Sequence, residues 1–124
     1  MFLALVLAVA ALLAISEAVW ATNDELAAYA AFSERAATYQ ADLTALPPDN
    51  VITDATALTE TYLAELDAMA PGACWADRWA YERTATDLLL TYIVAPYSDD
   101  EAANASLRLA YALWERYPEV PTTC

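Results

Sequence analysis

The chain has 124 residues and a formal net charge of −13, because 18 acidic residues face five arginines and no lysine; a nucleic-acid partner, which requires a basic surface, is therefore not expected. Histidine is absent, which excludes histidine-dependent catalytic triads and metal or haem sites with histidine ligands. Glycine occurs once, whereas the helix-forming residues alanine, leucine and glutamate are frequent, so an all-α fold is predicted.

An uninterrupted apolar run covers residues 2–15. The run is shorter than the roughly 20 residues that a membrane-spanning helix needs, and it suits the apolar region of a signal peptide. We predict cleavage after Ala21, so that residues 1–21 form a signal peptide and 22–124 the mature helical domain. No lysine or arginine precedes the run, which favours an alternative in which residues 1–22 remain as an N-terminal membrane anchor.

The first two predicted helices carry clear apolar faces. One begins at the capping box Thr22–Glu25 and ends near residue 46, before Pro47. The other covers about residues 53–70, with Thr53 or Asp54 as its cap. The apolar faces repeat at steps of three and four and consist of Tyr29, Phe32, Ala36, Tyr39, Leu43 and Leu46 in the first helix, and Leu58, Tyr62, Leu63, Leu66 and Met69 in the second.

The third predicted helix covers about residues 74–95. Its second half, LLLTYIVA, is apolar nearly all round, so we expect it at the centre of the bundle. Its first half is charged and aromatic, with spacings that predict weak ion pairs within the helix, Arg78–Glu82 and Arg83–Asp87.

The fourth predicted helix begins with Ser98 as its cap and Glu101 in its first turn. Its apolar face consists of Ala103, Leu107, Ala110, Trp114 and Tyr117, and Pro118 and Pro121 then favour an extended tail. Short connections between the four helices predict a small antiparallel up-down bundle.

The two cysteines support this arrangement. In an antiparallel hairpin, Cys74 at the start of the third helix lies about 10 Å from the end of the fourth. The seven residues that lead to Cys124 reach about 23 Å when extended, so a disulfide can close within the chain and would indicate an oxidising compartment. An intermolecular disulfide and a redox-active cysteine are the alternatives, although the chain has no C-x-x-C motif.

A group of aromatic and arginine side chains is the only candidate contact site. Such residues dominate binding hot spots, and we predict a protein-contact patch at one pole of the bundle, formed by Trp75, Trp79, Arg83, Trp114 and Tyr117. The alternative is that these rings cap the core while the arginines stack over them.

Other motifs predict no catalytic, cofactor or metal site. The stretch SDDEAAN lacks the spaced ligands and the glycine of a calcium loop. The triplet Asn104-Ala105-Ser106 matches a glycosylation sequon, but it falls inside a predicted helix. Adjacent acidic residues are explained by a solvated surface.

These observations predict a small secreted helical protein, extracellular or periplasmic, that is not an enzyme and needs no cofactor. It is expected to bind a protein partner, and the acidic net charge favours a basic one. The alternative is a membrane-anchored structural or assembly subunit that uses residues 1–22 as its anchor. A membrane contact is expected only through this N-terminal segment, and only if the segment is not cleaved.

Overall fold

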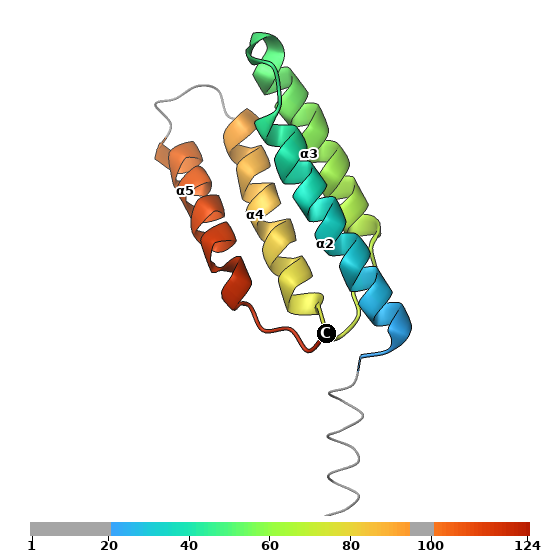
Figure 1. Ribbon diagram of the computed structural model, residues 1–124. Coiled ribbons are helices and arrows are strands. Elements are labelled where there is room, and N and C mark those ends of the chain that lie inside the picture. The colour runs from blue at the N-terminus through green and yellow to red at the C-terminus, as the bar shows by residue number, and fades with distance from the viewer. Residues whose placement is uncertain (1–20, 95–100) are drawn as a thin grey trace, which may run out of the picture.

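The computed structural model describes residues 21–94 and 101–124 and is all-helical in these ranges, as predicted (Figure 1). The predicted signal peptide (1–21) or anchor (1–22), apart from Ala21 and Thr22, and the predicted cap Ser98 lie outside the described residues. Consecutive helices run in opposite directions in Figure 1, and their bounds are α2 (Asn23–Thr44), α3 (Val51–Ala68), α4 (Ala76–Val94) and α5 (Glu101–Arg116).

The N-terminal boundaries of the first two helices have different causes. Thr22 Oγ1 accepts a hydrogen bond of 3.1 Å from the Glu25 backbone N–H, so the predicted cap is confirmed. The predicted cap of α3 is wrong, because a 3₁₀ turn, Pro48–Asn50, leads directly into a helix that begins at Val51. Proline is already shaped for a first turn, and this turn starts α3 two residues earlier than the polar cap residues indicate.

The turn before α4 and the tail after α5 are more ordered than predicted. Cys74 and Trp75 precede α4 in a turn closed by a 3.1 Å bond from Trp75 N–H to the Gly72 carbonyl. After α5, a second 3₁₀ turn, Tyr117–Glu119, comes before the extended residues that lead to Cys124.

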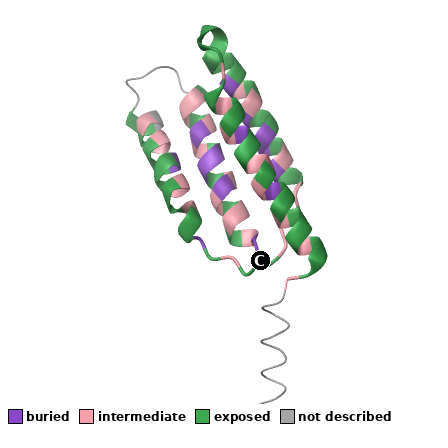
Figure 2. Cartoon of the chain, viewed as in Figure 1, coloured by how far each residue is buried: buried purple, intermediate pink, exposed green. Residues whose placement is uncertain are grey.

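The core lies mainly between α2, α3 and the turn that leads into α4. Its buried residues are Phe32, Tyr39, Tyr62, Leu63, Leu66, Cys74 and Trp75. The purple segments of Figure 2 show that burial also extends along α4, whose buried residues are Glu82, Ala85, Thr86 and Leu89. The Phe32 and Trp75 rings stack with centroids 5.1 Å apart. The predicted apolar faces of α2 and α3 are therefore confirmed.

The second half of α4 does not occupy the centre of the molecule. Within residues 88–94 only Leu89 is buried, and Val94 is 55% exposed. The helices that pack closely on α4 are α3 and α5, so neighbours cover two sides of a segment that is apolar nearly all round. The predicted central position of this segment was wrong, because an apolar residue on every face of a helix does not indicate how many of those faces neighbouring helices cover.

The single glycine is explained by a close approach between α2 and the α3–α4 connection. A Cβ atom at Gly72 would lie 2.9 Å from Cγ of Glu25, in the first turn of α2. This is closer than packed carbon atoms tolerate, so a larger residue would push the flexible Glu25 side chain aside.

The Cys74–Cys124 disulfide closes within the chain, with the two Cα atoms 5.0 Å apart. The tail is attached to the same turn by two hydrogen bonds to the Cys74 carbonyl, from Thr122 Oγ1 at 2.7 Å and Thr123 N–H at 3.1 Å. The intramolecular pairing is confirmed, and it holds the tail that follows α5 against the start of α4.

Replacing both cysteines, Cys74→Ser with Cys124→Ser, should lower the free energy of unfolding by about 4 kcal/mol, because the bridge closes a loop of roughly 50 residues in the unfolded chain. Urea unfolding followed by circular dichroism measures the change, and reductant on the native sequence serves as the control. Equal urea midpoints for the oxidised and reduced proteins would contradict this role.

Candidate binding groove around Glu82

A buried carboxylate joins three helices. Glu82 of α4 is 4% exposed. Its Oε1 accepts a 2.9 Å hydrogen bond from the Tyr62 hydroxyl of α3, and its Oε2 accepts a 3.1 Å bond from the Trp114 indole N–H of α5. The predicted Arg78–Glu82 ion pair is wrong, because Arg78 donates its hydrogen bonds elsewhere and Glu82 points into the helix contacts.

Burial raises the pKa of Glu82, and the hydrogen bonds from Tyr62 and Trp114 offset only part of this effect. Because the folded-state pKa lies above the unfolded value, the stability that Glu82 contributes is fully present below the unfolded pKa. It is lost as the pH rises through the folded pKa. Ionisation of Glu82 therefore costs more free energy in the folded protein than in the unfolded chain.

The donor Tyr62 is itself held rigidly. Its ring stacks on Tyr39 with centroids 4.2 Å apart, and the Tyr39 hydroxyl bonds to Thr59 Oγ1 at 2.8 Å. The Arg35 guanidinium lies 5.0 Å from the Tyr62 ring centroid and pairs with Glu65. Burial, together with the nearby Glu82 charge, raises the pKa of Tyr62 far above its usual value, so its hydroxyl stays a proton donor.

Glu82 lies at an aromatic groove of about 450 Å³. Helices α2 and α5 form its two sides, and residues of α4 form its floor. One wall is built from small or polar side chains of α2, and the opposite wall carries rings of α5. The lining residues are Tyr29, Ser33, Ala36, Ala37, Gln40, Arg78, Glu82, Tyr111, Trp114 and Tyr117. The groove remains open because the closely packed helix pairs are α2–α3, α3–α4 and α4–α5.

Arg78 closes one end of this groove. Its guanidinium lies between two rings, 5.9 Å from the Tyr29 centroid and 5.2 Å from the Tyr117 centroid. It also bonds to the Tyr29 hydroxyl and to the carbonyls of Val120 at 3.2 Å and Pro118 at 3.4 Å. Through these hydrogen bonds Arg78 ties α2, α4 and the tail together. Burial raises the pKa of the neighbouring Tyr117 hydroxyl to about 12.

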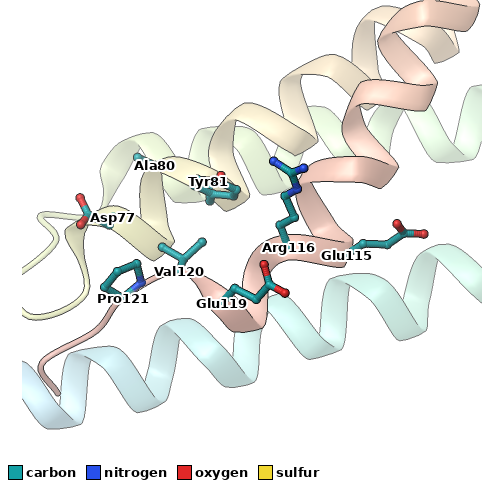
Figure 3. A pocket seen from close by; sticks show the side chains of 8 residues that line it. All are labelled: Asp77, Ala80, Tyr81, Glu115, Arg116, Glu119, Val120 and Pro121. Carbon is teal, nitrogen blue, oxygen red and sulfur yellow. The ribbon is translucent and has the colours of Figure 1, made fainter.

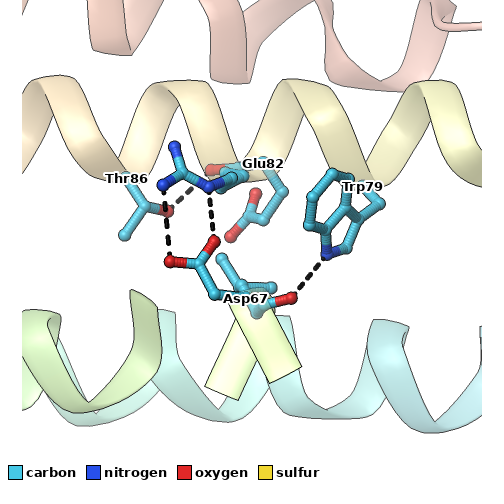
Figure 4. Close-up of polar contacts among 6 residues, drawn as sticks. Asp67, Trp79, Glu82 and Thr86 are labelled. Carbon is cyan, nitrogen blue, oxygen red and sulfur yellow. Dashed lines mark hydrogen bonds and ion pairs between the residues drawn. The ribbon is translucent and has the colours of Figure 1, made fainter. Parts of the chain in front are cut away.

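The five residues of the predicted contact patch do not form one surface. Trp75 is 2% exposed and belongs to the core. Trp79 and Arg83 face α3 instead, where the Trp79 indole N–H bonds to the Leu66 carbonyl at 2.9 Å and Arg83 Nε to Asp67 at 2.6 Å (Figure 4). Arg83 thus forms its ion pair with Asp67 rather than with the predicted partner Asp87, whose charge makes only a minor contribution to raising the Arg83 pKa.

Trp114 and Tyr117 both line the groove, and their role in binding stays a prediction. The predicted contact patch does not include Glu82, Arg78, Tyr29 and Tyr111, which line the groove with them. One signal for Glu82 was present: Trp75, Trp79, Glu82, Thr86 and Leu89 follow one another at steps of three and four along a single face of the helix. A carboxyl group in the middle of such a face is expected to be buried.

A second, wider depression of about 870 Å³ lies between α4 and the tail after α5 (Figure 3). Its charged side chains, Asp77, Glu115, Arg116 and Glu119, are all exposed, so water solvates them. Among the described residues, no cluster of acidic or cysteine side chains is arranged to hold a metal ion. The groove around Glu82 is the better candidate because it combines a buried charge with fixed aromatic walls.

Comparison with protein-family models, with curated proteins and with solved structures finds no match to this chain. Within residues 21–94 and 101–124, no helix is both long and apolar enough to span a membrane.

Two tyrosine-to-phenylalanine substitutions test the buried carboxylate. Tyr62→Phe removes a donor from ionised Glu82, which should cost about 2–3 kcal/mol of unfolding free energy at pH 8. Tyr39→Phe, the matched control, removes a bond between two hydroxyls and should cost about 1 kcal/mol. Urea unfolding measures both, and equal costs would contradict a charge at Glu82.

Proposed function

We propose that this protein is a small exported, non-enzymatic antiparallel helical bundle that binds a basic protein partner in the groove between α2 and α5. The observation that carries the proposal is the exposure of aromatic side chains along an open groove. Tyr111 is 57% exposed, and its ring meets Trp114 edge to face with centroids 6.1 Å apart. Tyrosine and tryptophan supply much of the binding energy at protein interfaces.

The charge of the chain supports a basic partner. A net charge of −13 attracts positively charged proteins and raises the rate at which they meet the surface. Glu82 places a buried carboxyl group at the groove itself.

The contacts of Glu82 favour binding over catalysis. A general acid or base exchanges its proton with a substrate, whereas the two oxygens of this carboxylate accept bonds from donors on two other helices. This arrangement supports a structural carboxylate at a binding site.

The disulfide indicates a non-reducing environment, which supports an extracellular or periplasmic protein.

The second candidate, a membrane-anchored assembly subunit, is favoured by the apolar run at residues 2–15. Intact mass spectrometry of the protein from its own host separates the two: export with processing predicts loss of residues 1–21, and an anchor predicts their retention.

Site-specific photo-cross-linking tests the groove as the binding surface. A benzoylphenylalanine at position 111 should form a discrete adduct with one basic polypeptide in the native host, because this ring stands at the mouth of the groove. The same group in place of Ala64, an exposed residue on α3, should not. Adducts of equal yield at both positions, or adducts with a second copy of this chain, would contradict the proposal.

A further inference from the structure

We propose that Glu82, Trp114 and Tyr111 form a receptor site for a single basic side chain, that of an arginine in the partner. This inference rests on the proposed function and specifies what the groove recognises. It is carried by a juxtaposition within the groove, where a buried carboxyl group that forms no ion pair with a described arginine shares the lining with two aromatic rings.

The charge of Glu82 has no counterion among the described residues. The ion pairs within the described part of the chain are Arg35–Glu65 and Arg83–Asp67, and neither includes Glu82. Although Arg78 lies one turn before Glu82, it directs its N–H groups to Tyr29 and to tail carbonyls. A buried carboxylate without a counterion is unfavourable, so a cation that enters the groove relieves a cost that the fold already carries.

The carboxylate keeps hydrogen-bonding capacity for a ligand. Each oxygen of an ionised carboxylate can accept about two hydrogen bonds, and each oxygen of Glu82 receives one from the side chains described, from Tyr62 and Trp114. Glu82 also contributes to the groove lining. The proposed site assigns these remaining acceptor positions to the guanidinium of the partner.

Arg78 demonstrates the mode of binding within the same groove. Its guanidinium is held between the rings of Tyr29 and Tyr117, and this type of contact strengthens when water is excluded. Next to Glu82, the Tyr111 and Trp114 rings meet at 73° and form a corner. The small side chains of the facing α2 wall, Ser33, Ala36 and Ala37, leave space for an incoming group.

Arginine fits this corner better than a compact ammonium. The guanidinium is planar, stacks on rings and forms parallel hydrogen bonds to a carboxylate. The positive charge of Arg78 in the same groove opposes a second cation and limits the affinity of an isolated side chain. The overall net charge of −13 acts in the opposite direction, and a partner supplies further contacts around the groove.

The test uses an acetylated, amidated Gly-Gly-Arg-Gly-Gly peptide and its citrulline analogue, which has the same shape without the charge. Binding to the ¹⁵N-labelled protein at pH 7.5 is followed through the Trp114 indole N–H signal, assigned with Trp114→Phe. The arginine peptide should bind with a dissociation constant on the order of 1 mM, at least about tenfold more tightly than the citrulline peptide.

Variants of the protein locate the effect. Glu82→Gln should weaken binding of the arginine peptide by about tenfold. Glu60→Gln, which removes one charge from an exposed position on α3, should change it by less than about twofold because surface charges are screened. Tyr111→Ala alters an exposed side chain, so the fold is retained, and it should also weaken binding.

Each alternative outcome has a distinct meaning. Equal binding of the two peptides, or no loss in Glu82→Gln, would overturn the arginine site, while position-specific cross-linking at residue 111 would still support the proposed function. Methylammonium binding as tightly as methylguanidinium would also overturn it, because the groove would then take any small cation rather than select the planar guanidinium. Failure of both the cross-linking and the peptide experiments would reject the function and the site together.

Discussion

The buried carboxylate of Glu82 is the constraint on which the rest of this fold depends. It accepts hydrogen bonds from Tyr62 and Trp114, so one group on α4 fixes the positions of α3 and α5. An ionised group that is 4% exposed is unfavourable unless its donors stay in place. The stacked Tyr39 and the Arg35 guanidinium above the Tyr62 ring hold one of these donors.

The same arrangement explains why a groove exists. Trp114 is turned toward Glu82, and Arg78 and the disulfide fix the tail that follows α5 near the start of α4. Helix α5 is thereby fastened to α4, and the space between α5 and α2 is left lined with aromatic rings. A disulfide-stabilised bundle with a fixed aromatic groove suits recognition outside the reducing interior of a cell, which is the basis of the binding function proposed above.

Local patterns predicted much of the fold, whereas the site depended on contacts between helices. The apolar faces predicted the buried residues of α2 and three of the five in α3, where Ala55 and Thr59 were not expected. The length of the extended tail predicted the Cys74–Cys124 bridge. Arg78 and Arg83 were assigned partners one turn away, but their actual partners lie 16 or more residues distant. Spacing along one helix cannot reveal such contacts. For Trp75 the sequence left two interpretations open, a contact surface and a ring that caps the core, and its burial agrees with the second.

The measurement closest to the central claim is a titration of the Glu82 side-chain carboxyl carbon by ¹³C NMR, with Glu82→Gln to assign the signal. The ordinary glutamate pKa is about 4.3, and burial at the junction of three helices should place the Glu82 midpoint above this value. A midpoint at or below the ordinary value would show that Glu82 is solvated or paired with a cation. That result would contradict an uncompensated carboxylate as the link between α3, α4 and α5.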